Sequence, residues 1–208
     1  MPFARSVFVN CPFDDRYRPI LDGILFCVVR AGLIPRLATE VADAGDNHLD
    51  RICRLMRESR FSIHDLSRCQ AIRKGELSRL NMPFELGIDQ GYRTSGSAQF
   101  AAKRFLVLDE VPYRLQRAIS DINGWDPSAH EGKEEKAIRL VRNWLHQEAD
   151  ANLPGGEVLL GQKLIFDEWK YGQPDHARAD VDAFSPFQLI GSMQRWCELG
   201  FPDDPLVR

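Results

Sequence analysis

Short apolar runs alternate with helical patterns along the first two thirds of the chain, and this alternation restricts the fold more than any other feature. The runs have the length of strands and cover residues 6–10, 33–38, 60–66 and 103–109. Apolar residues at helical spacing follow them, at 17–30, 48–58, 81–88 and 133–148. Because strand–helix–strand connections give parallel strands with helices on both faces, the sequence predicts an α/β fold.

A weak apolar run at 121–125 supplies a fifth strand, after a short helical pattern at 113–119. Five strands in this rhythm are typical of a flavodoxin-like three-layer fold. We therefore predict a five-stranded parallel sheet in the order 2-1-3-4-5 over residues 1–150.

The strand rhythm stops after the Pro-Gly-Gly sequence at 154–156. Two helical stretches follow, and Ser185 with Gln188 forms the pattern of a capping box at the start of the second. Because about 50 residues make a poor core alone, we expect residues 151–208 to be a C-terminal helical appendage to the α/β domain.

Composition excludes several classes of protein. The net charge of −3 argues against non-specific binding to nucleic acid or to an anionic membrane. The five cysteines are odd in number and widely spaced, so we expect no disulfide framework and no metal site. There is no N-terminal signal pattern, and no apolar stretch approaches the ~20 residues that span a bilayer. We interpret the chain as a cytoplasmic protein.

A ligand crevice is expected between the first and third strands, because an open parallel sheet binds ligands where its strand order reverses. The residues that this crevice would collect are polar or flank a loop, and they are Asn10, Pro12, Phe13, Asp14, Asp65, Ser67, Asn81, Glu85 and Gly87.

The helix after the third strand is expected to start at Asn81, a favourable N-cap residue, with Pro83 in its first turn. Glu85 then lies in the first turn, above the end of a strand that closes on Asp65. Gly87 is unfavourable inside a helix by about 1 kcal/mol relative to Ala, so we expect another backbone or a ligand to approach it closely.

Two acids near a crevice suit the cleavage of an N-glycosidic bond, which builds positive charge on the sugar. A carboxylate beside C1′ stabilises that charge or captures the sugar, and a second acid handles the leaving base. We take Glu85 and Asp65 as the candidate catalytic residues. Cations in the loop between them suit phosphate binding: Arg68, Arg73, Lys74 and Arg79.

Simpler interpretations stand beside these. Glu85 could be an acid favoured by the helix dipole, and Asp65 could cap a turn through Ser67. His64 is expected to be structural, and Cys11 a buried, unreactive thiol. Asp14 is expected to be a turn residue and not a metal ligand.

The residues 61–65 and the sequence Asn-Met-Pro-Phe-Glu-Leu-Gly at 81–87 resemble the signature of TIR-like nucleotide-binding proteins and of nucleoside 2-deoxyribosyltransferases. The opening at 10–13 resembles that of the transferases, with Cys11 in place of their glycine. The resemblance implies a flavodoxin-like sheet, a role for Glu85 at C1′ of a ribosyl group and a role for Asp65 toward the base. The acidic loop residue that the transferases carry before the Glu has no clear match here.

The leading functional hypothesis is a TIR-like N-glycosidase that hydrolyses NAD or a related nucleotide as substrate, with no cofactor and no metal. The alternatives are a nucleoside 2-deoxyribosyltransferase, a nucleoside 5′-phosphate N-hydrolase, and a non-catalytic nucleotide-binding or assembly module. The last is motivated by the apolar surface of the C-terminal helices, which suits either a cover for the crevice or a two-fold homodimer.

Overall fold

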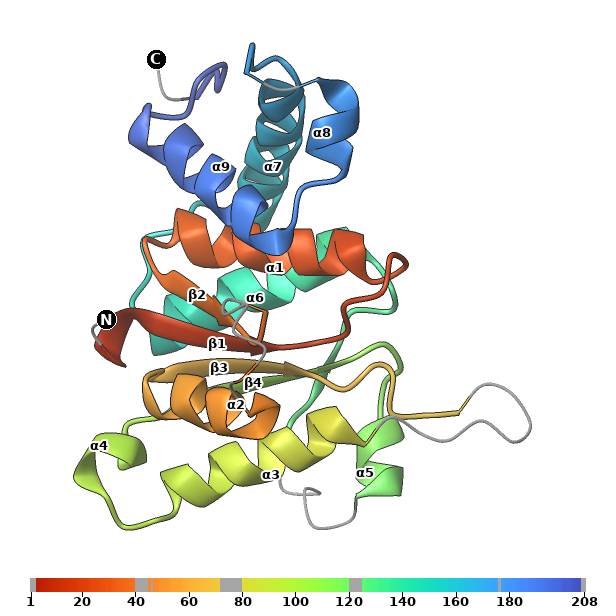
Figure 1. The fold of residues 1–208 in the computed structure, drawn as a ribbon, viewed down its shortest axis with the longest axis vertical. Helices are drawn as coiled ribbons and strands as arrows, with labels where there is room; N and C mark the ends of the chain where they lie inside the picture. The colour runs from red at the N-terminus through yellow and green to blue at the C-terminus, as the bar shows by residue number, and fades with distance from the viewer. Residues whose placement is uncertain are drawn as a thin grey trace. The chain divides into compact units, whose positions relative to one another are not determined.

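The fold is described from a computed structural model, which covers residues 3–39, 45, 47–71, 80–119, 125–175 and 177–206. The strands are β1 (Ser6–Asn10), β2 (Ile34–Leu37), β3 (Phe61–Asp65), β4 (Arg104–Asp109) and β5 (Ser128–Ala129). They form one parallel sheet in the order β2-β1-β3-β4-β5 (Figure 1). The predicted flavodoxin-like α/β fold and its strand order are confirmed.

Helices occupy the connections and the C-terminal third of the chain. They are η1 (Phe3–Arg5), α1 (Arg18–Arg30), α2 (His48–Arg57), α3 (Asn81–Arg93), α4 (Ala98–Ala101), α5 (Arg114–Ala118), α6 (Glu134–Glu148), α7 (Gly156–Tyr171), α8 (Arg178–Asp182) and α9 (Pro186–Glu198). No helix in the described ranges is long and apolar enough to cross a membrane.

The position of the fifth strand differs from the prediction. The run at 121–125 lies outside the described residues except for Trp125, and β5 is instead Ser128–Ala129, which pairs with the end of β4. The strand has two half-buried residues and no apolar character. Such a strand leaves no periodic signal in the sequence. The alternation of strand and helix patterns therefore led us to assign the fifth strand to the neighbouring apolar run.

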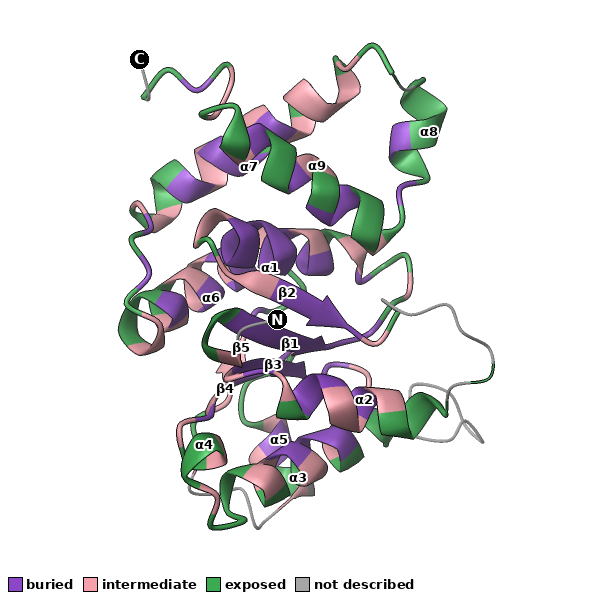
Figure 2. Ribbon diagram, turned by 60° about the vertical axis from the view of Figure 1, so that its left-hand side comes forward, coloured by how far each residue is buried: buried purple, intermediate pink, exposed green. Residues whose placement is uncertain are grey.

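The chain divides by its contacts into two compact units, and the first holds the whole sheet. This unit comprises Met1–Arg18 and Ile34–Lys133. β1 and β3 are buried along their full lengths, as Figure 2 shows. Helices α2 and α3 lie side by side on one face of the sheet, where Phe8 of β1 packs with Ile52 of α2 and Ile88 of α3. The candidate site residues all belong to this unit.

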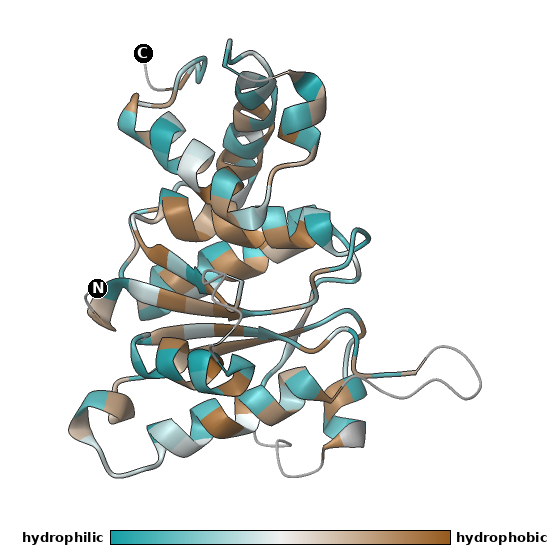
Figure 3. Ribbon diagram, in the orientation of Figure 1, coloured by the Kyte–Doolittle hydropathy of each residue, from teal (hydrophilic) through white to brown (hydrophobic). Residues whose placement is uncertain are grey.

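The second unit is helical and comprises Pro19–Leu33 and Glu134–Arg208. Helices α7 and α9 share it with α1, whose apolar character is visible in Figure 3. The ring of Phe26 on α1 lies 5.8 Å from that of Phe166 and 5.9 Å from that of Trp196. A Cβ atom on Gly23 would lie 3.0 Å from a carbon of Ile138, so glycine is what lets α1 approach α6 closely.

The start of α9 follows the sequence prediction. The backbone N–H of Gln188 donates to the Ser185 hydroxyl, and the Gln188 side chain accepts from the backbone N–H of Ser185. The capping box is therefore confirmed, with Pro186 at the first helical position.

Candidate functional site

A pocket of about 430 Å³ opens at the carboxyl end of β1. Its described lining residues come from the loop after β1 and from the start of α3, and they are Cys11, Pro12, Phe13, Asp14, Leu80, Asn81 and Met82. β1 pairs with β2 on one side and with β3 on the other, so the pocket lies where the strand order reverses. This is the crevice in which sheets of this kind bind ligands.

Four of the predicted site residues line this pocket directly: Pro12, Phe13, Asp14 and Asn81. The other five are not among its described lining residues, and they are Asn10, Asp65, Ser67, Glu85 and Gly87. Neither of the two candidate catalytic acids therefore lies on the described wall of the pocket.

Asp65 is fully buried at the end of β3, and donors surround its carboxylate. Its Oδ1 accepts hydrogen bonds from the backbone N–H of Ser67 at 2.9 Å and from the Ser67 hydroxyl, and its Oδ2 accepts one from the Tyr17 hydroxyl at 2.6 Å. The Nε2 atom of His130 lies 3.0 Å from Oδ2. Burial raises the pKa of this carboxyl, but the bonds from His130, Ser67 and Tyr17 outweigh burial and hold the pKa below its ordinary value.

The cluster of Asp65, Ser67 and His130 contains the residue types of a catalytic triad but not its geometry. The backbone N–H of Gly132 donates to His130 Nδ1 at 3.0 Å, so Nδ1 is an acceptor and we assign the ring proton to Nε2. Ser67 and Asp65 then both face Nε2, at 3.0 Å each. A triad needs its serine and its acid on different ring nitrogens. The cluster therefore joins the loop after β3 to the residue that follows β5, and it does not activate the serine.

Tyr17 and His130 are the residues of this cluster that sequence reasoning missed. They lie far from Asp65 along the chain, in segments without a motif. A buried acid at the end of a strand needs hydrogen-bond donors around its carboxylate. That requirement is the signal that would have prompted a search for residues such as Tyr17 and His130.

Glu85 contrasts with Asp65. Its side chain is 9% exposed, no described residue hydrogen-bonds its carboxylate, and burial raises its pKa to about 7. It lies one helical turn after Asn81, on the same side of α3 as that pocket residue. Its charge also raises the pKa of the Cys11 thiol, which lines the pocket. Glu85 is thus a nearly buried acid one helical turn from the pocket wall, with no hydrogen-bond partner among the described residues.

The start of α3 corrects two expectations. The backbone N–H of Phe84 donates to the carbonyl of Leu80 at 3.0 Å, so helical bonding begins one residue earlier than predicted. Leu80 is the N-cap residue, without a side-chain cap, and Asn81 is the first helical residue. Asn81 as N-cap and Glu85 in the first turn are both wrong, whereas Pro83 does lie in the first turn.

Gly87 lies on the exposed side of α3. No described atom outside its own helix backbone lies within 4 Å of the position that a Cβ would take. The close approach of another backbone is therefore not found among the described residues, and a contact with a ligand stays a prediction.

Cys11 lines the pocket as a neutral thiol. Burial raises its pKa well above the ordinary value, and the charges of Asp65, Asp14 and Glu85 raise it further. The nucleophilic form of cysteine is the thiolate. The thiol therefore supplies a small apolar surface to the pocket.

Arg68, a described cation of the loop after β3, is already paired. Arg68 donates two hydrogen bonds to Asp14, each at 3.1 Å, and one to Glu110 at 3.3 Å. This pairing ties the loop after β1 to the loop after β4, and it occupies the guanidinium that was expected to hold phosphate. The other expected phosphate ligands, Arg73, Lys74 and Arg79, lie outside the described residues.

A chain of buried polar side chains runs beneath the pocket. His64 Nε2 lies 3.2 Å from Asp89 Oδ2, and Lys103 Nζ lies 3.0 Å from Asp89 Oδ1, all three side chains being fully buried. Asp89 also accepts a bond from Ser62 at 2.6 Å. Burial raises the pKa of Asp89, but the bonds and charges of its partners hold that pKa below its ordinary value. His64 was expected to be structural, whereas Asp89 and Lys103 were not singled out.

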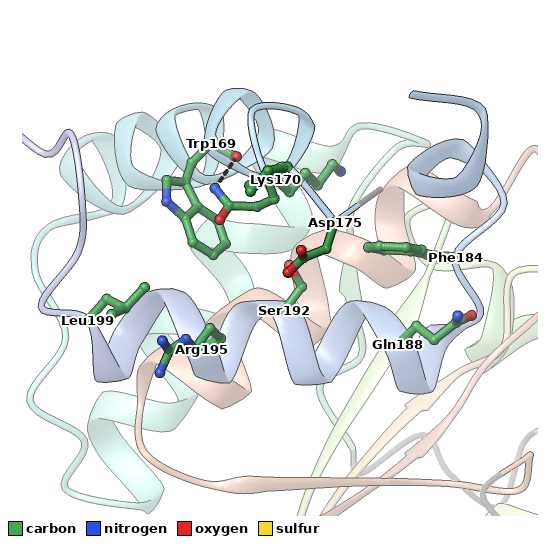
Figure 4. Close-up of a pocket in the computed structure, with 10 residues that line it drawn as sticks. Trp169, Lys170, Asp175, Phe184, Gln188, Ser192, Arg195 and Leu199 are labelled. Carbon is green, nitrogen blue, oxygen red and sulfur yellow. Dashed lines mark hydrogen bonds between the residues drawn. The ribbon is translucent and has the colours of Figure 1, made fainter. Parts of the chain in front are cut away.

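A second pocket, of about 400 Å³, lies within the helical unit between α7 and α9 (Figure 4). Trp169 and Phe184 form part of its wall, and Asp175 points toward Ser192. Two of its charged residues, Asp175 and Arg195, are exposed at the surface, and the third, Lys170, is partly exposed. The pocket above β1 is the stronger candidate, because buried partners fix the residues around it.

The described residues contain no group of three or more histidine, cysteine or acidic side chains placed to hold a metal ion. The resemblance of 61–65 and 81–87 to TIR-like proteins and deoxyribosyltransferases stays a prediction, because no comparison tests it. A scan of protein-family models, a search of curated proteins and a search of solved structures found no match for this chain.

Proposed function

We propose that this protein is an N-glycosidase that cleaves the bond between ribose and base in NAD or a related nucleotide. Glu85 carries the proposal. Its carboxylate is nearly buried, has no hydrogen-bond donor among the described residues, and lies beside a pocket at the reversal point of the sheet. Desolvated acids with a raised pKa are typical of catalytic sites.

The proposed reaction breaks the bond between C1′ and a nitrogen of the base. The bonding electrons leave with the base, positive charge develops on the sugar, and the ionised Glu85 stabilises that charge. Water then adds to C1′ and loses a proton. Among the described residues, Glu85 is the acid near the pocket that is free for this role, because Asp65 is enclosed and Asp14 is held by Arg68.

The enclosure of Asp65 favours NAD among possible substrates. The nicotinamide of NAD is bonded through a cationic ring nitrogen, so it leaves as a neutral molecule without taking up a proton. Purines and pyrimidines of ordinary nucleosides leave more readily when an acid protonates them. Asp65 is an acceptor for four donor groups, so it supports the loop after β3 and does not supply that proton. Deoxyribosyl transfer and nucleoside 5′-phosphate hydrolysis therefore rank second.

The test is nicotinamide release from NAD by the full-length protein, followed by chromatography. We expect Glu85→Gln to lower the rate by more than about 100-fold, because the amide cannot stabilise the charged sugar. Asp15→Asn is the matched control, since Asp15 is an exposed acid of the loop after β1. The wild-type rate should rise with pH through about 7, as Glu85 ionises. Release that persists in Glu85→Gln would remove this residue from the mechanism.

A second candidate is nucleotide binding without turnover. The observation in its favour is that neither Glu85 nor Asp65 is among the described residues that line the pocket. Binding of NAD without release of nicotinamide, weakened by Phe13→Ala at the half-exposed pocket rim, would establish this function in place of the first.

A further inference from the structure

Asn10, at the end of β1, connects the buried polar chain to the pocket. Its side chain is 5% exposed, and it directly precedes Cys11 of the pocket wall. Its Nδ2 atom lies 3.1 Å from His64 Nδ1 and 3.3 Å from the carbonyl oxygen of Met82, another pocket residue. Asn10 therefore touches both the sheet interior and the start of α3.

The orientation of the Asn10 amide follows from its two neighbours. The carbonyl oxygen of Met82 only accepts hydrogen bonds, so the group facing it must be the amide nitrogen. Asp89 is an ionised acceptor, so His64 carries its proton on Nε2 and presents an unprotonated Nδ1. Both neighbours demand a donor from Asn10. The assignment of nitrogen and oxygen is thus fixed by the network.

With the amide nitrogen assigned in this way, the Oδ1 atom of Asn10 is left as a hydrogen-bond acceptor without a donor among the described residues. Both amide hydrogens are used, and no described residue donates to Oδ1. Several polar atoms of this protein are sealed from solvent and have no hydrogen-bond partner, but Asn10 Oδ1 is not one of them. Because it has no partner among the described residues, it must retain contact with solvent. Leaving an acceptor unsatisfied in a side chain this deeply buried costs roughly 1–3 kcal/mol, unless water or a ligand donates a hydrogen bond to it.

We propose that Asn10 Oδ1 accepts a hydrogen bond from a ribose hydroxyl of the nucleotide bound in this pocket. The chain of His64, Asp89 and Lys103 is what holds the oxygen in that orientation. The inference rests on the proposed function for the class of ligand, since C2′ adjoins C1′ and C3′ is the next ring carbon, and that function places C1′ beside Glu85. It assigns Asn10 to binding and His64 to positioning.

The experiment measures binding of AMP, 2′-deoxy-AMP and 3′-deoxy-AMP to the full-length protein by calorimetry. We expect one of the two deoxy analogues to bind the wild type about 3- to 10-fold more weakly than AMP, the range for one hydrogen bond. In Asn10→Ala that ratio should fall to about one, because the acceptor is gone. A residue with a purely structural role would weaken all three probes equally and leave the ratio unchanged.

Asn152→Ala is the matched control, because Asn152 is an exposed asparagine of the helical unit and does not line this pocket. It should leave the ratio between AMP and its deoxy analogues as in the wild type. If Asn10→Ala does not fold, the affinities of the wild type for the three probes still test the inference. Equal affinity of the three probes, or absence of binding by all of them, would overturn the inference.

Failure of this inference is distinguishable from failure of the proposed function. Nicotinamide release that depends on Glu85, together with equal affinity for the three probes, would leave the N-glycosidase standing and reject the role of Asn10. Discrimination among the probes that depends on Asn10, without any nicotinamide release, would support the hydroxyl contact and reject catalysis.

Discussion

The end of β3 and the second turn of α3 each place a buried acid close to the same pocket, with opposite results. Asp65 is fully buried, yet its pKa lies below the ordinary value, because its donors outweigh burial. Glu85 is slightly more exposed, yet burial raises its pKa to about 7, because no described group donates to it. For these two acids, the supply of donors and not the depth of burial decides the direction in which the pKa shifts.

This difference separates the structural role from the proposed functional one. Asp65 joins the loops after β1 and β3 to β5 through Tyr17, Ser67 and His130. Glu85 contributes nothing comparable to the fold, and its desolvation is destabilising whenever it is ionised. An acid kept in such a place is better explained by a ligand or a reaction than by stability.

The largest expected effect on stability comes from removing Asp65, the acid whose carboxylate accepts several hydrogen bonds. Asp65→Ala should lower the free energy of unfolding by about 3–5 kcal/mol, since it leaves the Tyr17 hydroxyl buried without an acceptor and removes the charged acceptor of His130 Nε2–H. Chemical denaturation at pH 7 measures it. Asp15→Asn, at an exposed acid, should stay within about 0.5 kcal/mol of the wild type. A loss below about 1 kcal/mol for Asp65→Ala would contradict the structural role.

A smaller effect is expected at the other buried acid with donors, Asp89. Lys103→Met should lower the free energy of unfolding by about 3 kcal/mol, the low end for a broken buried ion pair, because Ser62 and His64 still hold Asp89. Adding Asp89→Asn to this variant should restore part of the loss, since no uncompensated charge then remains. Additive losses in the double variant would show that the pair is not coupled.

The smallest effect has the opposite sign. The folded protein holds the Glu85 proton up to about pH 7, whereas the unfolded chain releases it near the ordinary glutamate pKa of 4.5. Stability therefore falls as pH rises from 4.5 to 7, and Glu85→Gln avoids this loss. At pH 8 the variant should have a higher melting temperature than the wild type, by about 2–4 °C for each 1 kcal/mol gained in the free energy of unfolding. At pH 4.5 the two should coincide. A variant that is less stable at pH 8 would show that Glu85 has a stabilising partner.

The sheet was predictable from sequence because its signals are periodic. β1 to β4 are short apolar runs, and the helices between them repeat at helical spacing, so both type and order could be inferred. The two residues of β5 and the short helices α4 and α8 are too brief for any period, and they were missed.

The candidate site was predictable only where it is local. Asn10, Phe13 and Asn81 follow from the rule that places ligands at the reversal of strand order. The partners of the buried acids are long-range, with 48 residues separating Tyr17 from Asp65 and 63 separating Ser67 from His130. Lys103 was expected only as the first residue of a strand, and lysine is rarely buried. Its ammonium instead reaches the carbonyls of Met56 and Ser59, at 2.7 and 2.5 Å.

Titration of the side-chain carboxyl carbons by NMR tests the contrast between the two acids most directly. We expect the Glu85 signal to titrate near pH 7 and the Asp65 signal to remain that of an ionised carboxylate down to below pH 3.8, its ordinary pKa. Signals are assigned through Glu85→Gln and Asp65→Asn. A Glu85 carboxyl that titrates near 4.5 would show that the side chain is solvated or partnered, and it would contradict the central claim that Glu85 is a desolvated acid without a hydrogen-bond partner among the described residues.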